Sequence, residues 1–175
     1  MPALTPFQLL FVSAVLVGLF LLLEGLVSFR NEHRLRARGA VEPPDDVWPV
    51  MAAAYPAAFV SMLAEGFARG GPPPAVFLIG LAAWTLAKAL KFWAIASLGE
   101  RWSFRVLVLP DAPLVTSGPY RRLRHPNYLA VAGELIGAAV MTAAPVAGVI
   151  FTIAFVEIMR RRMRVEERAL GIRRS

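Results

Sequence analysis

The part of the chain best suited to chemistry is the run at residues 118–128, which reads GPYRRLRHPNY. It sets cationic, imidazole and tyrosine side chains between two long apolar runs, and a membrane-spanning role needs no such combination. Pro126 disfavours the helical region at His125 and suits the first turn of a helix, so we expect a helix to begin here. The exposed amides of a helix start attract an anionic group such as a carboxylate. Alternatively, the run is an interfacial anchor, with arginines at lipid phosphates and tyrosines in the aromatic belt.

Ionisable side chains also occur inside the apolar runs. Glu134 lies about two turns into the run that follows residue 128, and a carboxylate at that depth of a membrane is costly and indicates a functional site. Glu134 could act as a base, or it could pair with Lys88 or Lys91 in the preceding apolar run, and the two interpretations are compatible. Glu24 lies nearer the membrane interface. For this residue an ion pair, or a side chain that extends to the interface, is a simpler interpretation than a functional site.

A pair of carboxylates, Glu166 and Glu167, follows the last apolar run. We expect residues 160–170 to continue that run as a helix, in which neighbouring side chains point about 100° apart. A cofactor that carries an ammonium group, ribose hydroxyls and a sulfonium could use both carboxylates, whereas a solvated charged helix would leave both facing water. Arg162 and Glu166 have the spacing of an i, i+4 ion pair.

Membrane helices are the elements that must position these residues. The chain has 175 residues, which suits one domain (residues 1–175), and 57 % of them are hydrophobic, which indicates a membrane bundle rather than a soluble fold. A span needs about 20 apolar residues. The apolar runs are residues 4–29, 47–67, 75–98, 128–144 and 146–159, with Pro145 separating the last two. We therefore predict an all-α integral membrane protein with about five transmembrane helices, the last two forming a helical hairpin, and a small cofactor site on the cytosolic face.

The arginines are distributed unevenly among the connections. Residues 1–23 contain no Lys or Arg, and the stretch between the second and third runs contains only Arg69. Most arginines follow the first run, precede the fourth, or follow the fifth: Arg30, Arg34, Arg36 and Arg38; Arg101, Arg105, Arg121, Arg122 and Arg124; Arg160, Arg161, Arg162, Arg164, Arg168, Arg173 and Arg174. By the positive-inside rule this alternation predicts the N-terminus outside and the C-terminus and the site in the cytosol. It also explains the net charge of +7 by attraction to anionic membrane lipids, without nucleic acid as a partner.

The longest stretch outside the spans, residues 99–127, leads into the motif. We expect residues 104–109 and 114–116 to form a small β-hairpin at the inner membrane surface. The absence of cysteine excludes thiolate chemistry, and the two histidines are too few and too isolated for a metal site. The sequence has no Gly-x-Gly-x-x-Gly after a strand, no Walker loop and no Gly-x-Ser-x-Gly, so a nucleotide-like cofactor would bind without a Rossmann fold.

The segment Arg-His-Pro-x-Tyr after Gly-Pro-Tyr, together with the Glu-Glu pair near the end of the chain, resembles the isoprenylcysteine carboxyl methyltransferase family of integral-membrane enzymes. Residues 24–42 and 98–103 also look like the corresponding parts of short bacterial members. The resemblance implies a membrane O-methyltransferase of the bacterial inner membrane that uses S-adenosylmethionine as its cofactor. It further implies a cofactor site built from six residues: Tyr120, His125, Pro126, Tyr128, Glu166 and Glu167.

Arg124 and Glu134 are the catalytic residues that we expect beside such a cofactor site. Arg124 would orient a carboxylate acceptor, which is already ionised near neutral pH. A phenolic acceptor has a pKa of about 10 and needs a base, and Glu134 or His125 would be that base. Three further residues are expected to face the substrate: Glu24, Asn31 and Lys88.

Two classes of lipophilic acceptor stay open, namely an isoprenylcysteine-like carboxylate, free or on a prenylated partner, and a phenolic or enolic lipid such as an alkylresorcinol or alkylpyrone. Eukaryotic members continue past the Glu-Glu pair with Phe-Gly and a Tyr-rich tail, whereas this chain ends at Ser175, which favours the lipid. Two other functions are alternatives. Sterol-type membrane reductases bind NADPH with a similar Arg-His-Pro-x-Tyr segment, and a non-catalytic membrane scaffold would leave the clustered polar residues unexplained.

Overall fold

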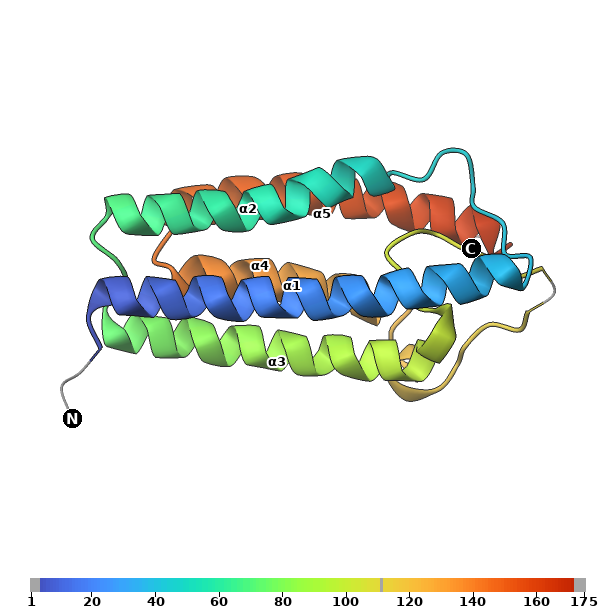
Figure 1. The fold of residues 1–175 in the computed structure, drawn as a ribbon, viewed down its shortest axis with the longest axis horizontal. Helices are drawn as coiled ribbons and strands as arrows, with labels where there is room; N and C mark the ends of the chain where they lie inside the picture. The colour runs from blue at the N-terminus through green and yellow to red at the C-terminus, as the bar shows by residue number, and fades with distance from the viewer. Residues whose placement is uncertain (1–3, 111, 172–175) are drawn as a thin grey trace.

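Five α-helices run back and forth along one long axis, and two short 3₁₀ turns follow the third helix and precede the fourth (Figure 1). The computed structural model describes residues 4–110 and 112–171. The helices are α1 (Pro6–Ala37), α2 (Trp48–Ala68), α3 (Pro74–Leu98), α4 (Pro126–Met141) and α5 (Pro145–Ala169), and the turns are η1 (Gly99–Arg101) and η2 (Gly118–Arg121). The described residues form no β-strand, so the prediction of an all-α fold is confirmed.

Proline marks the first turn of all five α-helices. A proline costs little there, because its missing N–H would have no partner within the helix and its φ already suits a helix. Thr5 and Gln8 add a capping box at the start of α1. At the start of α5, the carboxylate of Glu65 from the end of α2 accepts hydrogen bonds from the backbone N–H groups of Val146 and Ala147, at 3.2 and 2.6 Å. The helix starts are thus encoded locally, and Glu65 ties α2 to α5.

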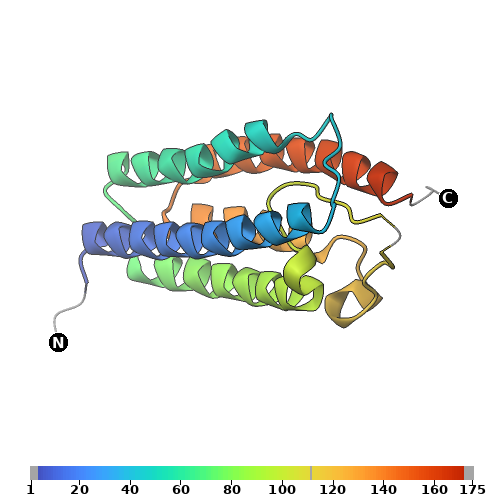
Figure 2. The same ribbon diagram turned by 45° about the vertical axis from the view of Figure 1, so that its right-hand side comes forward.

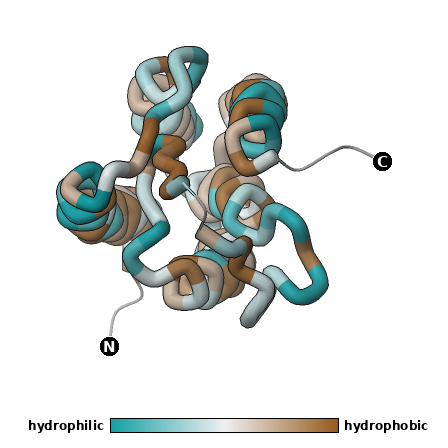
Figure 3. Tube along the Cα trace, turned by 90° about the vertical axis from the view of Figure 1, so that its right-hand side faces the viewer, coloured by the Kyte–Doolittle hydropathy of each residue, from teal (hydrophilic) through white to brown (hydrophobic). Residues whose placement is uncertain are grey.

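The functional motifs gather at one end of the bundle, the insert end. This end carries the connection from α1 to α2 (residues 38–47), the insert (residues 102–117) with its flanking turns, and the last turns of α5 (Figures 1 and 2). The opposite end carries the start of α1 and the tight connections at residues 69–73 and 142–144. Seen from the insert end, many of the loops and helix ends that face the viewer are hydrophilic (Figure 3). The fold therefore brings polar segments that are far apart in the sequence to one end of the molecule.

Helices α3 and α4 make the most extensive contact of the bundle. A Cβ atom at Gly137 of α4 would lie 2.6 Å from the backbone nitrogen of Trp84 in α3, and a Cβ atom at Gly80 would overlap the backbone of Met141. Glycine lets two backbones approach closely, as is common where membrane helices pack. This contact sets the lysines of α3 beside the carboxylate of α4.

The outward faces of the helices are apolar, while several charged side chains are buried. Phe11, Phe29 and Leu86 are at least 70 % exposed, whereas Glu24 and Glu134 are at most 2 % exposed. Ionisable residues of membrane helices face the interior of the bundle in this way, so the arrangement indicates an integral membrane protein. Among the described residues, α1, α2 and α3 extended by η1 are long and apolar enough to span a membrane. Helix α4 has 16 residues, fewer than the about 20 that a span needs, and the second half of α5 is highly charged, so full crossing by these two helices stays a prediction.

The β-hairpin predicted at residues 104–109 and 114–116 is wrong, because the described part of the insert contains no strand. Instead, Val108 forms a single antiparallel bridge with Val41, with N–O distances of 2.9 and 3.0 Å. The extended segment thus pairs with the connection between α1 and α2, which lies at the same end of the bundle and offers a partner for its backbone. The helical hairpin predicted around Pro145 is present as α4 and α5.

The arrangement of the helices and the arginines predicts the orientation of the chain in the membrane. The chain contains no cysteine, so single cysteines report their location without background. We expect Leu4→Cys to react with a membrane-impermeant thiol reagent on intact bacterial cells, and Arg164→Cys to react only after the cells are permeabilised. Arg69→Cys and Arg38→Cys serve as controls for the outer and inner connections. Labelling of Leu4→Cys and Arg164→Cys from the same side would contradict a five-span topology.

Candidate functional site

Two side-chain pairs join the start of α4 to the last turns of α5. The Tyr128 hydroxyl donates a hydrogen bond to Glu166 Oε2 at 2.8 Å, and His125 Nε2 lies 3.1 Å from Glu167 Oε1. His125 is the N-cap of α4 and Pro126 is its first residue, so the predicted helix start is confirmed. The two neighbouring carboxylates bind different partners, as expected for side chains that diverge around a helix. The motif and the Glu-Glu pair therefore form one structural unit.

Arg162 extends this unit toward the connection between α1 and α2. Its Nε donates to the Tyr128 hydroxyl at 2.9 Å, its Nη1 lies 3.4 Å from Asp46 Oδ1, and its side chain is buried. The predicted i, i+4 pair of Arg162 with Glu166 is wrong, because the guanidinium turns into the bundle toward Asp46 and both groups bind the same tyrosine hydroxyl. Sequence reasoning assigned Arg162 no role in the site, since only its burial distinguishes it from the other arginines of the tail.

Hydrogen bonds from side chains hold the insert across the end of the bundle. The backbone N–H of Phe104 donates to the Ser28 hydroxyl of α1 at 2.7 Å, and the backbone N–H of Val106 donates to Asp46 Oδ2 at 2.8 Å. Because Asp46 also pairs with a guanidinium of α5, one carboxylate fixes the insert relative to that helix. The insert is thus held by individual contacts rather than by a ladder of backbone hydrogen bonds.

Asn31, which we expected to face the substrate, also holds the insert. Its side-chain amide donates to the backbone carbonyls of Trp102 at 2.8 Å and Gly99 at 3.2 Å. It is buried and lines neither of the two cavities described below. The structure therefore places Asn31 as a support of the segment that covers the site.

Arg105 anchors the middle of the insert through Glu42. Its Nη1 lies 2.7 Å from Glu42 Oε1, and Arg36 pairs with the other oxygen of the same carboxylate. Burial alone would raise the pKa of Glu42, but the hydrogen bonds from Arg105 and Arg36 lower it below its ordinary value. The carboxylate is therefore ionised at neutral pH, and both ion pairs are kept there.

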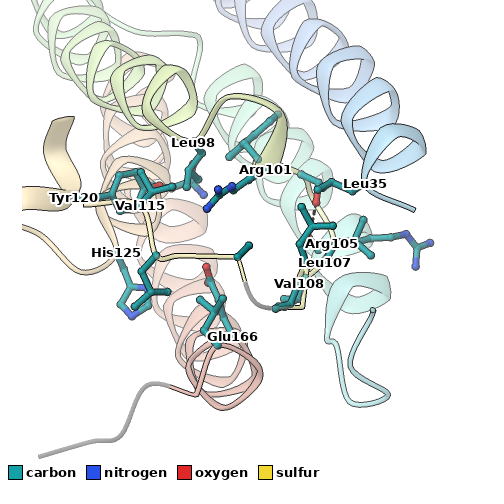
Figure 4. Close-up of a pocket in the computed structure, with 18 of the residues that line it drawn as sticks. Leu35, Leu98, Arg101, Arg105, Leu107, Val108, Val115, Tyr120, His125 and Glu166 are labelled. Carbon is teal, nitrogen blue, oxygen red and sulfur yellow. Dashed lines mark hydrogen bonds between the residues drawn. The ribbon is translucent and has the colours of Figure 1, made fainter. Parts of the chain in front are cut away.

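A cavity of about 150 Å³, the loop cavity, lies between η2, the insert and the last turns of α5 (Figure 4). Five of the residues predicted for the site line it: Tyr120, Arg124, His125, Tyr128 and Glu166. In Figure 4, Tyr120 and His125 lie at the side of η2 and α4, and Glu166 points into the cavity from α5. Pro126 is buried under the first turn of α4, and Glu167 lies outside the lining, bound to His125.

The loop cavity offers hydrogen-bonding groups of several kinds. Burial, together with the charge of Glu166, raises the pKa of Tyr120, so this residue presents a neutral hydroxyl at physiological pH. Arg124 lines the cavity from an exposed position. A hydroxyl, an imidazole, a guanidinium and a carboxylate together suit a polar ligand that carries both hydroxyl and charged groups.

A second cavity of about 530 Å³, the apolar cavity, lies between α1 and α2. Buried side chains of Val131 from α4 and Phe155 from α5 line it on the side of the core. Phe29, Ala52 and Pro56 also line it and are exposed on the outside of the bundle. The apolar cavity therefore reaches the lipid-facing surface between α1 and α2, where a hydrophobic ligand could enter.

The two cavities adjoin at the shared wall, whose residues line both: Trp102, Ser103, Arg105, Asn127, Tyr128 and Arg162. A polar cavity at the insert end thus borders an apolar cavity that reaches the membrane. Of these residues, sequence reasoning assigned a role in the site only to Tyr128. It overlooked Asn127, which occupies the unspecified position of the Arg-His-Pro-x-Tyr segment.

Deeper in the bundle, two lysines and two glutamates form the buried charge cluster. Lys88 Nζ lies 2.6 Å from Glu24 Oε1 and 3.1 Å from Glu134 Oε2, and Lys91 Nζ lies 2.6 Å from Glu24 Oε2 and 3.3 Å from Glu134 Oε2. The Tyr55 hydroxyl also donates to Glu134. The pairing predicted for Glu134 is confirmed, and Glu24 takes part in it. Equal numbers of positive and negative groups limit the cost of burying each of them.

The buried charge cluster meets the apolar cavity on one side. Lys91 and Tyr55 line that cavity, whereas Glu24, Lys88 and Glu134 lie behind them. The second carboxylate oxygen of Glu134 is buried without a hydrogen-bond partner among the described residues. The predicted base and two of the predicted substrate residues therefore lie close to the cavity without forming its surface.

Replacing Glu134 by Gln should destabilise the fold, because Lys88 and Lys91 would then face a single buried carboxylate, Glu24. Removing one side of a buried ion pair costs about 3–5 kcal/mol. We expect a clearly lower thermal unfolding midpoint in detergent. Lys88→Met in the Glu134→Gln background restores neutrality and should recover part of the loss. Equal midpoints for the wild type and the single variant would contradict a role of charge balance in stability.

Comparison with known proteins identifies the family of the chain. The model of the isoprenylcysteine carboxyl methyltransferase (ICMT) family matches residues 78–172, which include the motif and the Glu-Glu pair. An uncharacterized protein of Bacillus subtilis (strain 168), YpbQ, is 32 % identical over 148 residues, covering 84 % of this chain and 88 % of that protein. An uncharacterized protein of Haemophilus influenzae is 28 % identical over 146 residues, covering 83 % and 85 %. No solved structure matches the chain. With the motif residues joined around one cavity and the family model matching more than half of its length, the chain belongs to the isoprenylcysteine carboxyl methyltransferase family.

Proposed function

We propose that the protein is an S-adenosylmethionine-dependent membrane methyltransferase that methylates an oxygen atom of a lipophilic acceptor. The observation that carries this proposal is the shared wall. The loop cavity, with the motif residues, borders an apolar cavity that reaches the lipid-facing surface. A polar cofactor from the cytosol and an acceptor from the membrane can meet there, and neither has to cross the medium in which it is insoluble. Membership of the family supports methyl transfer as the reaction.

The loop cavity and its surroundings suit S-adenosylmethionine chemically. Glu166 would hold the ammonium group or the ribose hydroxyls, and Tyr120 and His125 add polar groups beside it. Glu167, which lies outside the lining, would keep His125 in position. Tyr128 donates to Glu166 and so keeps that carboxylate directed at the cavity. When bound, the cofactor supplies an electrophilic methyl group on a sulfonium.

The size of the loop cavity predicts a movement of the insert. Its volume of about 150 Å³ is below the about 300–1,000 Å³ that sites for ligands of drug size provide. The insert lines one side of the cavity and has no regular secondary structure in its described part. Because individual side-chain hydrogen bonds hold it, the insert can shift outward at the loss of few contacts. We therefore infer that the cofactor displaces the insert when it binds.

The acceptor would lie with its hydrophobic part in the apolar cavity and its reacting oxygen at the shared wall. Methyl transfer gains from orientation of the two reactants and from exclusion of water. For a carboxylate acceptor, Arg124 would supply the orienting charge. For a phenolic or enolic acceptor, Glu134 would act as the base through Tyr55, whose hydroxyl donates to Glu134 and whose side chain lines the apolar cavity. Glu24 and Lys88 would act indirectly, by holding this carboxylate and its neighbours in place.

Removal of the polar groups of the loop cavity should weaken cofactor binding. We expect His125→Ala and Glu166→Gln to lower the affinity for S-adenosylhomocysteine about tenfold to a hundredfold, because each removes a hydrogen bond that involves a charged group. Calorimetry on protein in lipid nanodiscs measures this affinity. Titration with NADPH alongside tests the reductase alternative, which predicts saturable NADPH binding.

Glu157→Gln is the matched control for this experiment. Glu157 lies on the same helix and is about half exposed, and its ion pairs among the described residues are with Arg160 and Arg161, each at 3.7 Å. Its replacement should leave the affinity unchanged. Wild-type affinity in both His125→Ala and Glu166→Gln, with unchanged thermal midpoints, would favour the interfacial anchor as the role of the motif.

Displacement of the insert should be visible in hydrogen exchange. When S-adenosylhomocysteine saturates the protein, we expect the exchange rate of peptides covering residues 104–110 to change, because the hydrogen bonds of Phe104 and Val106 to side chains are disturbed. Peptides of α2 at the opposite end serve as the internal control and should not change. Saturation without any change in the insert would contradict the displacement, though not the binding.

A further inference from the structure

Among the described residues, the polar side chains of the shared wall are already engaged with other protein groups, except those of Trp102 and Asn127. The Ser103 hydroxyl donates to the backbone carbonyl of Arg105 at 2.7 Å, and the Arg105 guanidinium pairs with Glu42 at 2.7 Å and lies 3.5 Å from Glu32. Tyr128 and Arg162 bind each other. Tyr128 also binds Glu166, and Arg162 also pairs with Asp46.

The indole N–H of Trp102 can only donate a hydrogen bond, whereas Asn127 carries a side-chain oxygen that can accept one. Among the described residues, this Oδ1 of Asn127 is buried without a hydrogen-bond partner, and the amide nitrogen makes no hydrogen bond either. Burying an amide oxygen without a hydrogen bond costs free energy of folding, so such oxygens are rare and often mark a functional site. Because Asn127 lines both cavities, its amide oxygen is a hydrogen-bond acceptor of the shared wall that is free to bind a ligand.

The backbone holds this amide in place. Asn127 is the second residue of α4, between the buried Pro126 and Tyr128, whose hydroxyl is bound to α5. The side chain can rotate, but the Cα atom cannot move away from the boundary of the two cavities without breaking the start of the helix. Asn127 therefore has a fixed position relative to anything that enters from either side.

The unpaired oxygen of Asn127 favours a ligand group that donates a hydrogen bond. A carboxylate carries only acceptor atoms, so it would leave this buried oxygen without a partner. The two guanidiniums of the shared wall, Arg105 and Arg162, are already paired with Glu42 and Asp46. A hydroxyl adds no charge to this partly desolvated region, and it can donate to the unpaired oxygen of Asn127.

We propose that Asn127 recognises the acceptor, with its amide oxygen accepting a hydrogen bond from a hydroxyl on the head of a membrane lipid. This proposal rests on the proposed function and names its substrate class, which is a hydroxyl-bearing lipid such as a phenol or enol rather than a carboxylate. Asn127 is thus the residue that determines acceptor specificity, and the cofactor is held by other groups of the loop cavity.

The test compares Asn127→Ala with Asn127→Gln in nanodiscs. A pentadecylresorcinol is the hydroxyl probe and S-farnesylcysteine is the carboxylate probe. Asn127→Ala should raise the KM for the resorcinol about tenfold, the upper range for loss of one neutral hydrogen bond, with little change in kcat. Asn127→Gln keeps a neutral amide oxygen as acceptor and should keep the KM within about threefold of wild type. Leu129→Ala, two residues along α4 and exposed to lipid, is the matched control and should behave as wild type.

Affinity for S-adenosylhomocysteine separates this proposal from the proposed function. Failure of the wild type to bind S-adenosylhomocysteine would overturn the proposed function. The resorcinol is also titrated in the absence of S-adenosylhomocysteine, so recognition of the resorcinol by Asn127 is measured independently of cofactor binding. Weaker binding of S-adenosylhomocysteine to Asn127→Ala would instead make Asn127 a cofactor ligand. An unchanged KM in Asn127→Ala, turnover of S-farnesylcysteine in preference to the resorcinol, or neither turnover nor binding of the resorcinol would each overturn the proposal.

Discussion

The hydroxyl of Tyr128 joins the start of α4 to two side chains of α5, and the geometry of the insert end depends on it. It donates to Glu166 and accepts from Arg162, and Arg162 in turn reaches Asp46. Asp46 also accepts the backbone N–H of Val106 in the insert. Because these groups are largely removed from water, each needs a partner within the protein. The positions of four segments therefore depend on one another: the start of α4, the end of α5, the connection between α1 and α2, and the insert.

The buried charge cluster imposes a second constraint, at the level of the helices. A charge in the interior of a membrane bundle is tolerated only beside an opposite charge, so Glu24 of α1, Lys88 and Lys91 of α3 and Glu134 of α4 must come together. The glycine contacts between α3 and α4 make this approach possible. Tyr55 then links the cluster to the apolar cavity. The same charges that specify how α1, α3 and α4 pack thereby lie next to the space proposed for the acceptor.

The two cavities follow from where the helices pack and where they separate. Between α1 and α2 the bundle leaves a space lined by apolar side chains, which is open to lipid. At the insert end the chain crosses the bundle as irregular backbone and encloses a polar space. The shared wall, with Asn127 at the start of α4, is the boundary of these two environments. A reaction between a water-soluble cofactor and a lipid needs such a boundary. The boundary is therefore consistent with membership of the isoprenylcysteine carboxyl methyltransferase family.

Local features of the sequence were sufficient to predict most of the helices. Each apolar run gave rise to a helix, and the prolines mark the first turns because a proline there loses no hydrogen bond. The residues of the motif and the Glu-Glu pair could be selected as site candidates because their charges and rings have no use in a span. The insert was predicted wrongly, since Val108 found its backbone partner in Val41, far away in the chain, and not in the neighbouring segment.

The sequence by itself determined that the chain forms apolar helices, where they begin, and which polar groups have to be accommodated, because hydropathy and backbone preference act over short stretches. Only the tertiary structure decided the partners of those groups. Arg162 could be distinguished from its neighbouring arginines only by its burial beside Tyr128. Asn127 could be distinguished only because its buried oxygen, at the boundary of two cavities, has no partner among the residues that the structure describes. Partners of this kind depend on long-range packing, since a buried hydrogen bond is made with whichever group the fold brings near, and spacing along the chain does not encode that.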